Sequence, residues 1–136
     1  MIMTPKLAYV TALIYLISAD NTVDSWESIQ LKADLKGLIK EDEISSIPEL
    51  IKRCQEYVRT TPLSRFLSES SRVLDKSQRM CLMLNLLDAA HRNGEVNQKE
   101  LQLIHKFGEV YEIAESRLLP YEKMFRLKND MRIFLQ

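Results

Sequence analysis

A stretch of this chain that occurs twice constrains the fold more than any other feature. The first copy covers residues 13–31 and the second covers residues 86–104. A shift of 73 residues aligns Asp20 with Asn93, Asn21 with Gly94, Val23 with Val96, Asp24 with Asn97 and Glu27 with Glu100. Each copy is typical of an apolar helix, a short polar turn and a second helix with a polar cap. The repeat predicts two similar helix pairs, repeat 1 over about residues 5–39 and repeat 2 over about residues 76–110.

Length and residue usage favour a single helical domain over residues 1–136. A chain of 136 residues can form a core without disulfides or metal ions. It contains only three Gly and four Pro, and β-branched residues rarely alternate with polar ones. We therefore predict an all-α fold, a compact bundle of six or seven helices that contains the two pseudo-repeated helix pairs.

Helix caps and helix breakers set the predicted boundaries. Pro5 and Pro48 suit the first turn of a helix, and Asp75 suits an N-cap. Residues 68–71 interrupt the apolar pattern, and Pro120 would kink a helix that began before it. The predicted helices are residues 5–19, 25–39, 47–59, 62–70, 76–92, 97 to 107 or 110, and 120–132.

The charge balance argues against nucleic acid as a partner. The 19 basic residues equal the 19 acidic ones, so the chain lacks the positive charge of a nucleic-acid-binding protein. A net charge of zero also gives no general reason for adhesion to anionic membranes. No stretch reaches the ~18 apolar residues of a transmembrane helix, so none is predicted.

A cytoplasmic location is predicted from the cysteines and the N-terminus. Cys54 and Cys81 lie in apolar helical patterns without a CxxC spacing, which predicts buried free thiols in a reducing compartment. The apolar N-terminal segment is predicted to be a core helix rather than a signal peptide, because residues 80–92 have the same character in mid-chain.

The two copies also resemble a known family. An apolar helix followed by (A/H)-x-D-G-x-(V/L)-(D/S/N)-x-x-E-x-x-x-(I/L) is the pattern of the TerB-like tellurite-resistance family, and residues 19–31 and 91–104 resemble it. The first copy has Asn21 in place of the Gly, and the second has Asn93 in place of the Asp. The resemblance extends over essentially the whole chain. It implies a compact helical bundle, a role in tellurite resistance or stress response, and an acidic surface where the turns and the following helices meet.

The resemblance also implies a divalent-cation site. Its ligands would be Asp20, Asp24, Glu27, Glu95 and Glu100, whose oxygens suit Ca²⁺ or Mg²⁺. The spacing is not that of an EF-hand. The second copy has Asn at two positions where acids are common, so the first copy is the better candidate. The alternative needs no metal, because a turn residue, an N-cap and a capping box account for the three acids of the first copy.

Other candidate residues carry weaker signals. Trp26 is predicted either to anchor a protein partner or to pack over the first helix. His91 and His105 lack a zinc-binding spacing, so His91 is predicted to interact with a helix C-terminus and His105 to lie on a helix surface. Met80, Cys81 and Met83 are predicted core residues rather than soft-metal ligands.

The sequence therefore leaves three hypotheses of function open. The first is a non-enzymatic TerB-like interaction module that binds a divalent cation and an unknown protein partner. The second is a pure protein–protein scaffold, which predicts an exposed apolar or aromatic patch. The third is a small hydrolase or reductase, which is disfavoured because no nucleophile–base pair is evident.

Overall fold

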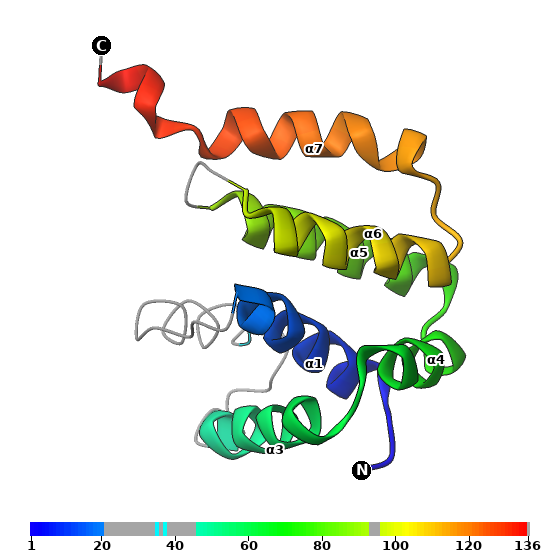
Figure 1. Ribbon diagram of the computed structural model, residues 1–136. Helices are drawn as coiled ribbons and strands as arrows, with labels where there is room; N and C mark the ends of the chain where they lie inside the picture. Colours follow the sequence, from blue (N-terminus) through cyan, green and yellow to red (C-terminus); the bar gives the residue numbers. More distant parts are fainter. Residues whose placement is uncertain (21–34, 36, 38–45, 93–95, 136) are drawn as a thin grey trace. The chain divides into compact units, whose positions relative to one another are not determined.

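The computed structural model describes residues 1–20, 35, 37, 46–92 and 96–135. These residues form helices and no strand, so the predicted all-α class is confirmed. The helices of Figure 1 are α1 (Pro5–Ile17), η1 (Ser18–Asp20), α3 (Ile47–Thr60), α4 (Leu63–Val73), α5 (Lys76–His91), α6 (Gln98–Val110), α7 (Glu115–Asn129) and η3 (Met131–Phe134), η1 and η3 being 3₁₀-helices.

The chain divides into two compact units, residues 1–73 and residues 74–136. The boundary falls between the two copies of the repeated stretch. In the second unit, α5 and α6 occupy the range predicted for repeat 2. The predicted helix at 25–39 lies outside the described residues except for Leu35 and Gly37. The pairing of the two copies and the single domain therefore stay predictions.

The first unit is built around α1, which packs against α3 and α4. The side chain of Thr4 caps α1 by accepting a hydrogen bond from the Leu7 amide at 3.2 Å, and Pro5 occupies the first position. Most of the side chains from Ala8 to Leu16 are buried, as expected for a helix that is apolar nearly all round.

An aromatic and carboxylate cluster joins the three helices of the first unit. The ring of Phe66 on α4 lies 5.1 Å from the ring of Tyr15 and 6.1 Å from that of Tyr57, centroid to centroid. The Tyr57 hydroxyl donates to Glu69 Oε2 at 2.7 Å, and the Tyr15 hydroxyl donates to the Thr61 carbonyl at 2.7 Å. Burial raises the pKa of Tyr15 to about 12, and the negative charge of Glu69 adds to the shift.

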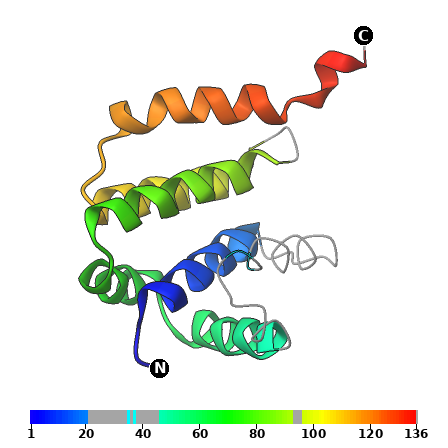
Figure 2. The same cartoon turned by 180° about the vertical axis from the view of Figure 1, so that it is seen from behind.

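The second unit has α5 at its centre, packed against α6 and α7. Figures 1 and 2 show these three helices running side by side. The predicted cap at Asp75 is confirmed as a capping box, because Asp75 Oδ1 accepts from the Gln78 amide and Gln78 Oε1 accepts from the Asp75 amide. The buried side chains of this unit include Met83, Leu86, Leu87, Ile104 and Phe107.

Two predicted helix boundaries are wrong. The fourth predicted helix was expected to end near Ser70, but α4 continues to Val73. The hydroxyls of Ser70 and Ser71 donate to carbonyls three residues earlier in the same helix, so serine does not interrupt it. The last helix begins at Glu115 and runs through Pro120. The carbonyl that the missing proline N–H would have bonded belongs to exposed Ser116, where water can reach it.

The two cysteines, both predicted to be buried, differ in their exposure. Cys54 is buried as predicted, and burial raises the pKa of its thiol. Cys81 is exposed, so the prediction of a second buried thiol is wrong. Cys81 lies on the exposed side of α5, whereas its neighbour Met80 is half-buried and Met83, two residues later, is fully buried.

No helix among the described residues is long and apolar enough to cross a bilayer.

Candidate functional site

Most of the residues predicted to hold a cation lie outside the described part of the chain. Asp24, Glu27 and Glu95 are in this group, and Trp26, the predicted partner anchor, also lies outside the described residues. Asp20 is the last residue of η1. Glu100 is half-buried in the first turn of α6. The structure therefore neither brings the predicted ligands together nor separates them, and the cation site stays a prediction.

Among the described residues, no group of three or more His, Cys, Asp or Glu side chains is arranged to hold a metal ion. The capping function that competes with metal binding is visible at Asn97, whose side chain accepts from the Lys99 amide at 2.7 Å. Asn97 is the counterpart of Asp24 in the first copy. At Ser46, the N-cap of α3, the side chain makes no cap hydrogen bond, so the sequence Ser46-Ile47-Pro48-Glu49, which is typical of a capping box, does not form one.

The two histidines occupy different environments. His91 is the last residue of α5, as predicted, but its ring is only 1% exposed. Its Nδ1 lies 2.7 Å from the Leu87 carbonyl, which can only accept, so Nδ1 carries a proton. His105 lies partly exposed on α6, which confirms its predicted surface position.

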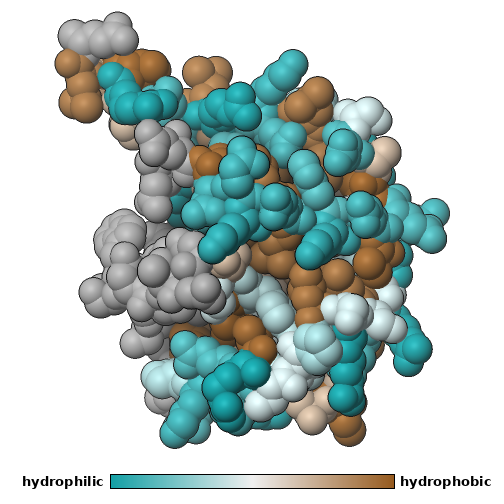
Figure 3. Space-filling view, in the orientation of Figure 1, coloured by the Kyte–Doolittle hydropathy of each residue, from teal (hydrophilic) through white to brown (hydrophobic). Residues whose placement is uncertain are grey.

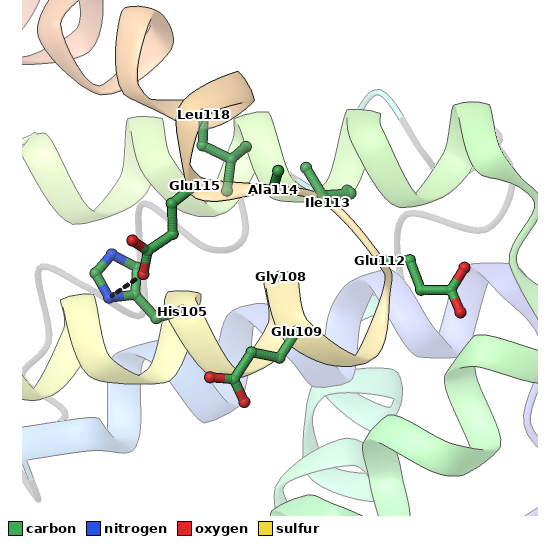
Figure 4. Close-up of a pocket in the computed structure, with 8 residues that line it drawn as sticks. All are labelled: His105, Gly108, Glu109, Glu112, Ile113, Ala114, Glu115 and Leu118. Atoms are coloured by element: carbon green, nitrogen blue, oxygen red, sulfur yellow. Dashed lines mark ion pairs between the residues drawn. The ribbon is translucent and has the colours of Figure 1, made fainter.

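A pocket of about 480 Å³ lies where α6 turns into α7 (Figure 4). His105 Nδ1 is 3.6 Å from Glu115 Oε1, and its Nε2 is 3.9 Å from Glu122 Oε1. Figure 4 shows Glu109 and Glu112 pointing away from the His105–Glu115 pair. The carboxylates of this pocket therefore do not converge on one point, and the pocket does not resemble a cation site.

The turn beside this pocket has a defined geometry that ends α6. The Ile113 amide donates to the Gly108 carbonyl at 2.9 Å and the Glu112 amide to the Glu109 carbonyl at 3.4 Å, which is the Schellman pattern. Glu112 has φ 59°, the left-handed conformation that usually belongs to glycine. Gly108 allows the chain to return closely, because a Cβ there would lie 3.2 Å from the Ile113 carbonyl oxygen.

The second unit also presents a group of exposed apolar side chains near its C-terminal end. Three are on α7, and three follow in η3 and the next residue. We call this set the outer apolar face, and its exposed fractions are Leu119 48%, Met124 50%, Leu127 71%, Met131 62%, Phe134 73% and Leu135 84%. Figure 3 shows hydrophobic side chains at the projecting C-terminal segment and, with hydrophilic side chains between them, along the top of the view. Large exposed apolar side chains gathered in one region of a surface often mark an interaction site.

The outer apolar face lies opposite the side of α7 that packs in the unit. Leu118 faces the core, because it is 2% exposed and its Cδ1 comes within 3.7 Å of a Cβ placed on Gly108. Phe125, seven residues later and nearly in line with Leu118, is half-buried. The side chains of α7 are therefore apolar on two opposite sides, and only one side is covered.

Positive charge surrounds the outer apolar face. Lys123, Arg126 and Lys128 are exposed on α7, and Lys128 Nζ forms an ion pair with Asp88 Oδ1 on α5 at 3.2 Å. Among the carboxylates of the same segment, Asp130 binds the side chain of Arg132 at 2.9 Å, and the side chain of Glu122 is mostly buried beside His105. The Asp130–Arg132 contact lowers the pKa of Asp130. The charge that α7 presents beside its exposed apolar residues is therefore mainly that of Lys123 and Arg126.

This face was not among the features predicted from the sequence. Its signal was present, because Leu119, Met124, Leu127 and Met131 recur at spacings of three to five residues. Beginning the helix at Pro120 removed Leu118 and Leu119 from the pattern. Without Leu118 and Leu119, the sequence pattern did not show that the helix has two separate apolar sides.

Comparison of the chain with protein families, with curated proteins and with solved structures finds no match.

Proposed function

We propose that this chain is a non-enzymatic interaction module that binds its partner through the outer apolar face. The observation that carries the proposal is the exposure of Met124, Leu127 and the η3 side chains on a helix whose opposite side is already packed. Leaving these side chains in water forgoes about 25 cal/mol for each Å² of apolar surface that a partner would cover. An exposed apolar patch of this kind is what the scaffold hypothesis requires.

The TerB-like assignment is part of the same proposal. It places the module in the cytoplasm and in tellurite resistance or stress response. Its support is the pair of matching motifs around Asp20 and Asn93. A divalent cation at the acidic turns is compatible with this module, and its test is separate from that of the outer apolar face.

Photo-crosslinking tests the proposed function directly. A benzophenone amino acid replaces Leu127 in the full chain, and a control chain carries it at Val110, an apolar residue of α6 that is 40% exposed. In cells that express the chain, we expect a defined adduct from position 127 and none from position 110. Adducts of equal yield at both positions, or none at either, would overturn the proposal.

A further inference from the structure

We infer that the outer apolar face binds the surface of an anionic lipid bilayer, an inference that rests on the proposed function of that face. The surface of a helix is convex, so this face presents side chains outward and does not enclose a ligand. The pockets around His105 and Arg79 contain none of the six residues of the face. An extended convex apolar surface suits a bilayer interface, into which side chains insert individually.

The arrangement of cations on α7 supports a negatively charged partner. Arg126 and Lys128 lie about 100° to either side of Leu127 around the helix, and Lys123 lies about one turn before it. All three side chains are exposed, but Lys128 is already paired with Asp88, which leaves Lys123 and Arg126 to attract a negatively charged partner. Lysine and arginine beside an apolar face can bury their aliphatic stems against it and extend their charges to lipid headgroups. This local pattern coexists with a net charge of zero for the whole chain.

The C-terminal segment extends the same surface. Met131, Phe134 and Leu135 carry the apolar character beyond the end of α7 at Asn129. Figure 1 shows η3 projecting past the end of α7. At 15 residues, α7 is shorter than the ~20 apolar residues that cross a bilayer, so the helix would lie in the plane of the interface.

A second copy of the chain fits this surface less well. Two copies that met through the outer apolar face would bring the cations around Leu127 close to those of the other copy. Asp88 already offsets Lys128 and Asp130 binds Arg132, so Lys123 and Arg126 of each copy would face those of the other. Anionic lipid headgroups complement the same charges without this repulsion.

Vesicle co-sedimentation of the purified full chain tests the inference. One vesicle type contains phosphatidylcholine alone, and the other contains about one third phosphatidylserine, which gives a negative surface potential. We expect binding to the second type, weakened by high salt because salt screens exposed charges. Leu127→Asn should weaken binding about tenfold or more, and Lys123→Gln or Arg126→Gln about fivefold each.

Two matched controls separate the face from general surface effects. Val110→Asn removes an exposed apolar side chain from α6, and Lys106→Gln removes an exposed cation from the same helix. Both should leave vesicle binding unchanged. Circular dichroism should show the same helix content for Leu127→Asn as for the wild type, because the Leu127 side chain is exposed.

The outcomes distinguish this inference from the proposed function. Absence of binding to the anionic vesicles, or equal binding to both vesicle types, overturns the inference, as does equal weakening by the α7 and α6 variants. A protein adduct from position 127, with no vesicle binding, overturns the bilayer as partner and leaves the proposed function standing. A lipid adduct from position 127 supports both.

Discussion

Leu118 and Leu127 lie nine residues apart on α7, which is two and a half turns, so they point in opposite directions. Leu118 is buried in the second unit, whereas Leu127 is one of the most exposed leucines of the described chain. A helix with apolar side chains on two opposite sides needs an apolar surface to pack against each of them. The second unit supplies one of them, and the other is the proposed partner.

The first prediction compares these two leucines. Leu118→Ala should lower the free energy of unfolding by about 2–5 kcal/mol, because it removes buried methyl groups and leaves a cavity. Leu127→Ala should change it by less than about 0.5 kcal/mol, because the side chain is exposed. Urea denaturation followed by circular dichroism measures both. Similar losses for the two variants would mean that the orientation of α7 is wrong.

The second prediction concerns pH and the carboxylate of Glu69. The hydrogen bond from the Tyr57 hydroxyl, assisted by Arg65, holds the pKa of Glu69 below its ordinary value of 4.5. The folded state therefore favours the ionised carboxylate more than the unfolded chain does. The resulting stabilisation is present above pH 4.5 and is lost as the pH falls below it.

Glu69→Gln should reduce this loss of stability between pH 6 and pH 3. Tyr57→Phe should cost about 1 kcal/mol at pH 7, because a partly exposed hydrogen bond to a charged group is lost. In a double-mutant cycle, the two changes should be non-additive, since both remove the same hydrogen bond. Additive effects would show that the Tyr57–Glu69 contact does not contribute to stability.

The third prediction is a stabilising substitution in the turn after α6. Glu112 adopts a left-handed conformation that costs a non-glycine residue about 1–2 kcal/mol. Glu112→Gly relieves this strain, and the greater backbone entropy that glycine loses on folding offsets part of the gain, so the free energy of unfolding should rise by about 0.5–1 kcal/mol. Glu109→Gly, inside α6, is the matched control and should destabilise. If Glu112→Gly also destabilises, the turn does not have this geometry in solution.

The fourth prediction tests the divalent cation that the TerB-like resemblance implies. Thermal melts with millimolar Ca²⁺, Mg²⁺, Mn²⁺ and Zn²⁺ should show a rise in Tm with a hard cation, because a ligand at about 100 times its Kd adds roughly 2.7 kcal/mol. An unchanged Tm would remove the metal hypothesis. The double variant Asp20→Asn with Glu27→Gln should abolish the rise. If it lowers stability equally with and without metal, these two acids act only as turn and cap.

The sequence predicted the parts of the fold that local chemistry determines. The start of α1 at Pro5 and that of α5 after Asp75 follow from caps that the structure forms with the predicted residues. The position of α6 follows in the same way from Asn97. Such caps act over three or four residues, so a single sequence contains all the information that they need.

The errors arose where surroundings rather than local preference decide the structure. Pro120 is unfavourable inside a helix, but here the carbonyl that it leaves unpaired is exposed to water. Cys81 has the apolar character of a core residue and yet lies on the exposed side of α5. The candidate site was missed for the same reason, since periodicity shows that α7 has apolar sides without showing which of them the chain covers.

Methionine oxidation tests the outer apolar face most directly, because three native methionines report on it without substitution. Met124 and Met131 belong to the face, and Met83 is fully buried in the same unit. In the purified chain, we expect peroxide to convert Met124 and Met131 to the sulfoxide well before Met83, since access governs the reaction. In cells, where the partner is present, Met124 and Met131 should become protected. Their protection in the purified chain, or equally fast oxidation in cells, would contradict the proposal that this face is an interaction surface.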